Sequence, residues 1–411
     1  MLIITMVKGV PARTTGVITV SGVLRREEMD LVMNPHDSKA LQAAHYLRQA
    51  VGGKIIAVSM GPEPKIVPIM QDLYEPNQES RYVPRMPIYG VDENIVLSDR
   101  RMAGADTLAT AYALSAGVKK IIDIHADAVK NLINMVESGA SAAEIERKAE
   151  ELYRENLIPN KIYSTLSTIG DSAVKLFAEG KITREELLNR LHSALEDVYN
   201  FIIIAGMKTS DGETGNTGPQ TAEGLGELLG KLIPHVAFVR DFEIFPDERI
   251  IVASRRVGNL VQRLRIPLPC LLTIHTEYTP KIPPASYQKK AKRNGYRGQV
   301  KKVKVWDADY IGADPSRLGF SGSPTIVGPG MEIGKPPVQK IVGESLVFER
   351  DVDEFEWRGG KYGPFKKGDL VQNLPEELVM ELREKNIIGV FTLKHLLDEL
   401  FGGVKLVARA V

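Results

Sequence analysis

The segment from residue 201 to residue 230 holds the residues whose types and spacing could do chemistry. It begins with an apolar, β-branched run, Phe201–Ala205, which is typical of a buried strand of a parallel sheet. A loop of Gly, Ser, Thr, Asp and Asn follows, and a helical pattern with Pro219 near its first turn comes after it. A strand, a glycine-rich loop and a helix N-terminus bind anions, because backbone N–H groups point outward and the helix dipole favours negative charge. The sequence therefore predicts a phosphate site, with an ordinary strand–helix turn as the alternative.

The loop itself supplies the small and hydroxyl-bearing residues that such a site needs. Gly212, Gly215 and Gly218 are expected to let the backbone approach an anion, while Thr214 and Thr217 add hydroxyl donors. The segment contains no GKS or GKT, and its glycines do not fit GxGxxG. It is therefore neither a P-loop nor a dinucleotide-binding fingerprint.

Other reactive residues are scattered. Asp211 and Glu213 resemble a catalytic carboxylate pair, but beside glycines and hydroxyls they are expected to orient ribose, phosphate or the loop. The seven histidines show no metal-ligand spacing, and His36 and His275 are interpreted as surface or capping residues. Cys270 is interpreted as a small core residue, and no nucleophile elbow is present. A phosphate site without an evident protein acid or base indicates cofactor chemistry.

Composition limits the class of protein. The chain has 411 residues, 43% hydrophobic and 26% charged, with a formal net charge of +1. These values describe a globular protein with two or three domains and no overall field that would attract nucleic acid. One cysteine excludes a disulfide framework and fits a reducing compartment. Without a signal peptide pattern or a transmembrane window, we expect a cytoplasmic protein, or at most one held at a membrane through a partner.

The elements that must position the loop alternate between strand and helix. Apolar runs predict buried strands, and helical patterns separate the first of them. The predicted strands are Leu2–Val7, Lys54–Ser59, Glu93–Leu97 and Phe201–Ala205, with helices over Ser38–Val51 and residues 107–114. This alternation predicts a doubly wound, mostly parallel α/β sheet. Ligands of such sheets lie outside the carboxyl ends of the strands, where Met60-Gly61-Pro62 follows its strand.

Residues 121–199 interrupt the alternation with almost wholly helical patterns. Ser141–Glu144 and Thr183–Glu186 both fit a capping box, which predicts two helix starts. Because a sheet covered on both faces offers little further surface, we interpret this block as an insertion whose helices cover each other and contact another subunit.

The last third of the chain contains candidate partner surfaces. Tyr278–Pro284 is a proline-rich loop, and Gln288–Arg293 is expected to form a basic helix. Together they predict a docking segment for an acidic partner, with a solvated basic face as the alternative. The tail from Ile326 ends in a predicted helix near Leu393–Leu400 and is either an arm that packs on something else or a small domain.

Several motifs in order resemble the beta subunit of the electron-transfer flavoprotein family, over most of residues 1–120 and 197–327. The matching segments are Val7–Pro11, Asn34–Asp37, Ala57–Pro62, Leu97–Arg100, Ala103–Thr110, Asp211–Gln220, Leu268–Lys292 and Gly322–Thr325. The chain departs from that family at Thr209-Ser210 and Gly215-Asn216, in a longer stretch over residues 62–90, in the helical block and in the long tail.

The resemblance implies an adenine nucleotide alpha hydrolase-like fold with a helical insertion and an extended C-terminal arm. The implied parts are a nucleotide- and flavin-binding domain over residues 1–120 and 197–273, the insertion over 121–196, a partner-recognition segment over 274–327 and the arm over 328–411. In this family the pocket under the central loop holds AMP in simple carriers and FAD in electron-bifurcating members. The GPQ at 218–220 and the AGADT at 103–107 are similar to the bifurcating type.

The implied activity is that of a flavin-dependent, NADH-oxidising oxidoreductase working within a complex. FAD would accept hydride from NADH, and the electrons would divide between a high-potential acceptor, reached through the flavin of an alpha subunit, and a low-potential acceptor such as ferredoxin. Implied partners are the alpha subunit, a ferredoxin or ferredoxin-like subunit, and a quinone oxidoreductase or dehydrogenase. Two alternatives stay open: a carrier with AMP in the pocket, and a nucleotide-binding scaffold of universal-stress type without redox work.

The resemblance also implies which residues bind the cofactor, with no protein-bound metal and no catalytic side chain among them. They are Lys8, Gly9, Val10, Asn34, Ser59, Met60, Gly61, Asp99, Arg100, Gly104, Ala105, Asp106, Thr107, Gly206, Asp211, Gly212, Thr214, Gly215, Asn216, Thr217, Gly218 and Gln220.

Overall fold

The computed structural model describes most of the chain and divides it into two compact units. It describes residues 1–12, 19–20, 23–24, 30–72, 91–159, 161–163, 172–279, 303–325, 346–371 and 374–390. The units are Met1–Met331 and Glu332–Val411, and each is described by itself. The expected basic helix at 288–293 and the expected helix at 393–400 lie outside the described residues.

The first unit begins with an alternation of strands and helices and continues into a helical block. Up to that block the elements are β1 (Leu2–Met6), β2 (Gly9–Pro11), β3 (Thr19–Val20), β4 (Val23–Leu24), β5 (Leu31–Met33), α1 (Pro35–Val51), β6 (Lys54–Met60), α2 (Glu63–Asp72), β7 (Glu93–Leu97), the 3-10 turn η3 (Arg100–Met102) and α3 (Thr107–Glu137). The remaining elements are α4 (Ala142–Arg154), α5 (Ala173–Ala178), α6 (Arg184–Tyr199), β8 (Ile202–Gly206), α7 (Thr217–Leu229), β9 (His235–Phe245), β10 (Ile250–Val257), β11 (Leu260–Pro267), β12 (Cys270–Ile274), β13 (Lys304–Trp306) and the 3-10 turn η4 (Pro315–Arg317).

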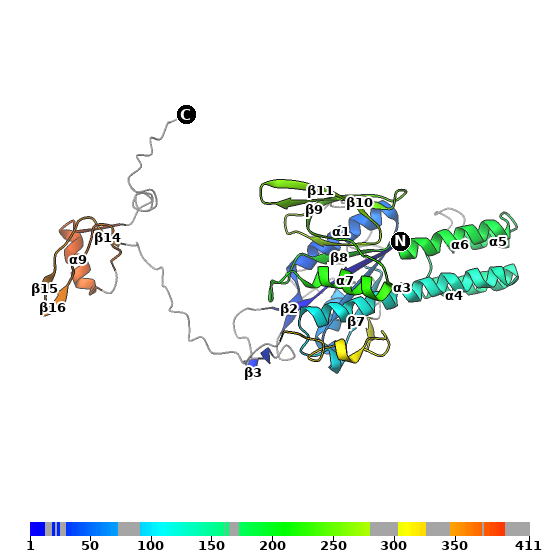
Figure 1. Ribbon diagram of the computed structural model, residues 1–411, viewed down its shortest axis with the longest axis horizontal. Helices are drawn as coiled ribbons and strands as arrows, with labels where there is room; N and C mark the ends of the chain where they lie inside the picture. Colours follow the sequence, from blue (N-terminus) through cyan, green and yellow to red (C-terminus); the bar gives the residue numbers. More distant parts are fainter. Residues whose placement is uncertain are drawn as a thin grey trace, which may run out of the picture. The chain divides into compact units, whose positions relative to one another are not determined.

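A nine-stranded sheet in the order β11-β10-β9-β12-β8-β1-β6-β7-β13 forms the centre of this unit (Figure 1). Every neighbouring pair from β9 to β13 is parallel, whereas β10 runs antiparallel to both β9 and β11. The inner strands β1, β8 and β12 are apolar and almost wholly buried, as expected for strands covered on both faces. The predicted α/β fold with a mostly parallel sheet is therefore confirmed.

Alternate residues of each strand face two separate apolar layers. Ile4, Ile56 and Ile203 belong to the layer under α3 and α7. Ile3, Ile55 and Ile204 belong to the opposite layer, under α1 and α2. Helices on both faces leave the ends of the strands as the accessible part of the inner sheet.

The helical block projects beyond the sheet (Figure 1). Both predicted capping boxes are present: Ser141 caps α4 with Glu144, and Thr183 caps α6 with Glu186. Helix α3 runs without a break for 31 residues, so residue 121, where the insertion was expected to begin, lies inside it. The guanidinium of Arg184 donates to the carbonyls of Val136 and Ala140, which joins the start of α6 to the end of α3.

The second unit has a small core of its own. Its elements are β14 (Leu346–Phe348), β15 (Phe355–Trp357), β16 (Gly360–Tyr362), α9 (Glu376–Glu384) and β17 (Ile388–Val390). Phe348 stacks on Phe365 at 4.3 Å and packs with Leu378, Leu382 and Ile388. Across the described parts of both units, no helix is long and apolar enough to cross a membrane.

Candidate nucleotide site at the carboxyl edge of the sheet

The predicted site residues meet at one edge of the sheet, where the parallel strands end. Lys8, Gly9 and Val10 follow β1, Ser59, Met60 and Gly61 end β6, and Asp99, Arg100, Gly104, Ala105, Asp106 and Thr107 lie between β7 and α3. Asn34 precedes α1, and Gly206, Asp211, Gly212, Thr214, Gly215, Asn216, Thr217, Gly218 and Gln220 run from the end of β8 into α7. The chain proceeds from β1 through β6 to β7 on one side and places β8 on the other side of β1. Such a reversal of strand order opens a crevice at the carboxyl ends of the strands, here between β1 and β8.

An ion pair spans this crevice. The Lys8 ammonium lies 2.8 Å from an Asp211 carboxylate oxygen, although the two residues are 203 positions apart in the chain. Lys8 follows β1, and Asp211 lies in the loop that follows β8. The pair therefore holds the glycine-rich loop at the reversal point.

A buried hydrogen-bond network around Asn34 holds the same loop in place. Asn34 is fully buried, and its amide donates to the Asp37 carboxylate at 2.9 Å and to the Lys208 carbonyl at 3.0 Å. Its oxygen accepts from the Ser210 amide at 3.3 Å. Asn34 stands at the N-cap position of α1 but makes no side-chain capping bond, because its polar atoms anchor the loop.

Asp37 links the crevice strands and is the buried carboxylate of the network. It accepts hydrogen bonds from the backbone amides of Lys8 and Gly206 and from the Asn34 side chain. Burial raises the pKa of Asp37 to about 7, against the opposing effect of these hydrogen bonds. A Cβ on Gly206 would lie 2.4 Å from an Asp37 oxygen, so the end of β8 requires glycine.

The loop from β8 to α7 has a conformation that suits anion binding. Glu213 and Gly215 have φ values of 52° and 67°, and Gly215 would place a Cβ 3.2 Å from the Met207 carbonyl. Asn216 precedes α7 without capping it, so its side chain does not occupy the first amides of the helix. Across the loop Lys208 pairs with Glu213 at 2.9 Å. Free helix amides with nearby lysines favour a phosphate group.

Gly218 has a packing role in addition to the ligand-binding role predicted for it. A Cβ there would lie 2.7 Å from the Thr273 methyl group of β12. Its missing side chain lets α7 pack on the sheet, and the residue is buried.

Two predicted residues keep a buried oxygen without a partner. Among the described residues, neither the Ser59 hydroxyl nor the Gln220 amide oxygen has a hydrogen-bond partner. Ser59 is 1% exposed and lies at the end of β6, while Gln220 lies in the first turn of α7. Buried polar atoms are normally satisfied, so two orphans at this edge fit a bound molecule that supplies the missing hydrogen bonds.

The segment after β7 contributes a second helix N-terminus. Asp106 caps α3 by accepting from the Leu108 and Ala109 amides and also accepts from the Thr325 amide at 3.1 Å. A Cβ on Gly104 would lie 2.2 Å from the Phe320 ring. Residues 104–107 are therefore held against residues 319–325.

Asp99 has several hydrogen-bond partners, whereas Arg100 makes no ion pair within the described residues. Asp99 accepts from Arg101 and from the Ala308 amide, and these hydrogen bonds, that of the Arg101 side chain above all, hold its pKa well below the usual range. Arg101 in turn pairs with Asp309. Arg100 is exposed and, within the described part of the chain, makes no ion pair, so it is the arginine of this turn that remains for a ligand.

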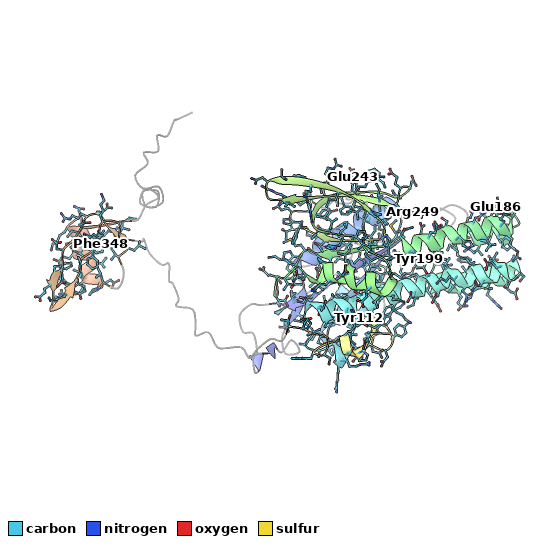
Figure 2. The ribbon with its side chains drawn as sticks, in the orientation of Figure 1. Tyr112, Glu186, Tyr199, Glu243, Arg249 and Phe348 are labelled. Atoms are coloured by element: carbon cyan, nitrogen blue, oxygen red, sulfur yellow. The ribbon has the colours of Figure 1, made fainter. Side chains whose placement is uncertain are left out.

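The rest of residues 303–325 packs on α3 through Tyr112, which Figure 2 labels. The Tyr112 hydroxyl accepts from the Asp314 amide at 2.8 Å, and the Arg317 guanidinium lies 4.1 Å from the centre of its ring. This packing keeps residues 319–325 beside the start of α3.

Sequence reasoning missed several residues of the site. His36 lies near Lys208, Glu213 and His275, while His275 lies near Arg240 and accepts from the Glu277 amide at 3.1 Å. Burial lowers the pKa of both histidines. The His36 Nδ1 is buried and has no partner among the described residues. The position of His36 before Asp37 in the Asn34–Asp37 segment was the available signal. No group of three or more His, Cys, Asp or Glu among the described residues could hold a metal ion.

Comparison with known proteins finds one matching family model and several relatives. Residues 21–129 match the family model "Electron transfer flavoprotein domain". The chain is 26% identical over 335 residues to "Electron transfer flavoprotein subunit beta" of Clostridium acetobutylicum, covering 82% of this chain and 86% of that protein. It is 28% identical over 309 residues to "Protein FixA" of Bradyrhizobium diazoefficiens, covering 75% and 74%. It is 23% identical over 369 residues to "Caffeyl-CoA reductase-Etf complex subunit CarD" of Acetobacterium woodii, covering 90% and 92%.

Proposed function

Because this chain belongs to the electron-transfer flavoprotein family as a beta-type subunit, we propose that the carboxyl edge of its sheet binds FAD. The observation that carries the proposal is the loop between β8 and α7. It is held across the reversal point by the Lys8–Asp211 pair and lies at the same edge as the unpartnered oxygens of Ser59 and Gln220. An adenine nucleotide has both the phosphates that helix amides bind and the ring nitrogens that polar side chains recognise.

Each part of the site has a defined task in this proposal. The first amides of α7 and the ammonium of Lys208 bind phosphate oxygens, and exposed Arg100 adds a positive charge from the neighbouring turn. Ser59 and Gln220 orient the nucleotide through their buried oxygens. The Asn34–Asp37 network does not touch the ligand, because its hydrogen bonds are used to keep the loop in place.

FAD bound here would supply hydride acceptance from NADH and release of single electrons. The chain would work with an alpha subunit that carries a second flavin, a high-potential acceptor served through that flavin, and a low-potential acceptor such as ferredoxin. The relative named as a subunit of a caffeyl-CoA reductase–Etf complex supports assembly with further proteins. We expect a dehydrogenase or quinone oxidoreductase among them.

Anaerobic NADH oxidation by the complex with the alpha subunit tests this function. We expect ferredoxin reduction only when a high-potential acceptor is present, because the two electrons then leave to different acceptors. Electron delivery to the high-potential acceptor alone, with one flavin and AMP in the complex, would instead make the protein a simple carrier. A complex without flavin would make it a nucleotide-binding scaffold.

A further inference from the structure

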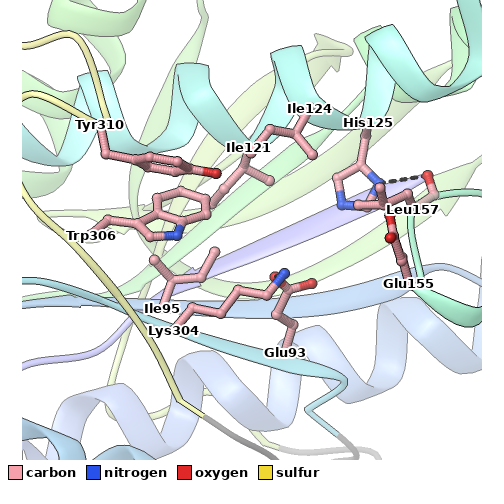
Figure 3. A pocket seen from close by; sticks show the side chains of 10 residues that line it. All are labelled: Glu93, Ile95, Ile121, Ile124, His125, Glu155, Leu157, Lys304, Trp306 and Tyr310. Carbon is pink, nitrogen blue, oxygen red and sulfur yellow. Dashed lines mark hydrogen bonds and ion pairs between the residues drawn. The ribbon is translucent and has the colours of Figure 1, made fainter. Parts of the chain in front are cut away.

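A cavity of about 360 Å³ lies away from the nucleotide site, under α3 at the β13 edge of the sheet (Figure 3). Glu93 is the first residue of β7 and Lys304 is the first residue of β13, so the cavity opens near the amino ends of these strands. The nucleotide site lies at their carboxyl ends. The two sites therefore cannot share one small ligand.

The walls of the cavity are apolar and aromatic. Ile121 and Ile124 of α3 face Ile95 of the sheet, and Trp306 and Tyr310 close one end with ring centres 5.2 Å apart (Figure 3). Its volume lies at the small end of the range for ligand pockets, which is about 300–1,000 Å³. The cavity suits one planar ring with a short substituent.

The other end of the cavity carries a buried charge cluster. Both carboxylate oxygens of Glu93 are paired, one with Lys54 and one with Lys304, each at 2.6 Å. Burial would raise the pKa of Glu93, but the two lysines outweigh it and the pKa lies below its usual value. Two ammonium groups therefore share the Glu93 carboxylate.

Histidine adds no charge to this cluster, and two further carboxylates, those of Asp92 and Glu155, lie beside it. Burial, reinforced by the charge of Lys54, lowers the pKa of His125 to about 4, so its ring is neutral near pH 7. The ring nitrogen Nδ1 lies 2.9 Å from the Leu157 carbonyl and Nε2 lies 3.4 Å from the Lys54 ammonium. Asp92 pairs with Arg48, and Glu155 is exposed at the mouth.

Two hydrogen-bond donors remain unused on the cavity side. Among the described residues the indole N–H of Trp306 has no partner, although the residue is only 6% exposed. Lys304 is half exposed and pairs only with Glu93 within the described part of the chain, so further N–H groups of its ammonium are available. Both donors are available to an acceptor oxygen of a bound molecule.

We propose that this cavity binds a small aromatic carboxylate, with its ring against Trp306 and the isoleucines and its carboxylate toward Lys304. The ring fills the apolar volume, and the carboxylate accepts from Lys304 and from the Trp306 indole. The ligand carboxylate gives the Lys304 ammonium a second anionic partner, which a neutral ring cannot do.

Fluorine NMR of the full-length protein with para-fluorobenzoate tests the proposal. We expect saturable broadening of the ligand signal, and binding at least roughly tenfold weaker for the isosteric para-fluorobenzamide, because a charge-assisted hydrogen bond is replaced by a neutral one. Absence of saturable binding would overturn the proposal. Equal binding of acid and amide would do the same.

Three variants locate the binding event. Lys304→Met should weaken benzoate binding roughly tenfold while Glu93 keeps its pair with Lys54. Ile124→Trp should fill the cavity and abolish binding without changing the charge cluster, whereas Lys148→Met, at an exposed pair on α4, should bind as the wild type does. Unchanged binding by Ile124→Trp would place the ligand elsewhere and contradict the assignment. Cofactor content should be the same in all of these proteins, so a failure here is separate from a failure of the proposed function.

Discussion

Lys8 and Asp211 show how single residues define the candidate nucleotide site. The ammonium group is about one third exposed and its partner less so, hence the pair contributes little to overall stability. Its effect is local, because it joins the residue after β1 to the loop after β8. The loop is thereby ordered before a ligand arrives, and the ligand does not have to supply that ordering energy.

Replacing Lys8 with methionine should therefore lower nucleotide affinity more than stability. We expect roughly tenfold weaker binding from loss of loop order and of a positive charge near the phosphates. The change in unfolding free energy should stay below about 1 kcal/mol. Titration calorimetry with FAD and urea unfolding measure the two quantities, and Lys148→Met serves as a surface control. An equal loss of FAD affinity in Lys8→Met and Lys148→Met would show that Lys8 does not contribute to the site.

Asp37 predicts a pH dependence of stability. Its pKa is raised from 3.8 to about 7 by burial, so the folded protein holds a proton that the unfolded chain releases above pH 4. Its contribution to stability is fully present below pH 4 and is lost as the pH rises through 7. Between pH 5 and pH 8 the loss should approach roughly 3 kcal/mol.

Asp37→Asn should remove this pH dependence, because the amide does not titrate. The variant should be less stable at pH 5, since its NH₂ group meets the donors of Lys8 and Gly206. Thermal melting at the two pH values checks this result. A variant that loses stability with pH as steeply as the wild type would show that another group titrates.

For single residues, the sequence predicted which segments meet at the site but not which hydrogen bonds their side chains make. Asn34 was predicted to contact the cofactor, and the structure adds that its side chain anchors Lys208 and Ser210. Asp106 was predicted to contact the cofactor as well, and it also caps α3. Such roles depend on neighbours more than a hundred residues away, which local patterns do not specify.

The loop between β8 and α7 is the element that converts these contacts into a binding surface. Gly215 has a positive φ inside the loop, and Gly230 has a similar φ of 64° at the C-terminus of the same helix. The two glycines carry similar backbone strain on substitution, but only one lies where the phosphates are proposed to bind.

Gly215→Ala should weaken FAD binding, whereas Gly230→Ala should not. Each alanine is forced into the left-handed region, which should cost each protein about 1 kcal/mol of stability. The methyl group of Gly215→Ala also comes within 3.2 Å of the Met207 carbonyl, so this variant should lose somewhat more. Loss of affinity in the first protein alone, measured by calorimetry, would be due to the loop. Gly218→Val is unsuitable for this test, because its branched side chain would collide with Thr273 and disturb the packing of α7.

The helical block offers a test of what the α/β part needs. The Arg184 contacts bring the ends of α3 and α6 together, so residues 138–183 can be replaced by a short Gly-Ser link. This choice keeps His125 and the whole of α3. We expect the shortened chain to keep its FAD and its alpha subunit and to lose assembly with additional subunits, as seen by light scattering.

That same deletion removes Glu155 and Leu157 from the cavity under α3 and should abolish benzoate binding. Loss of FAD together with benzoate would mean that the block is part of the core and not an added part.

Among the helices and strands, the two capping boxes were predictable because they depend on residues three apart. The unbroken course of α3 was not, because no local signal shows where a long helix leaves the sheet.

The whole chain places two sites at opposite ends of the same parallel strands. The carboxyl edge holds the proposed FAD site, and the amino edge at β13 holds the proposed carboxylate cavity. The strand–helix alternation was sufficient to predict the first of these edges, since parallel strands end together. The cavity was not predictable, because Lys54, Glu93, His125 and Lys304 converge only in the folded protein.

The measurement that tests the central claim most directly is the identity and amount of nucleotide released when the purified complex with the alpha subunit is denatured. We predict two FAD per pair for the wild type and for Gly230→Ala. We predict one FAD per pair for Gly215→Ala, because only the flavin in this chain depends on that loop. Release of AMP with a single FAD from the wild type, or two FAD from Gly215→Ala at the wild-type affinity, would contradict the account.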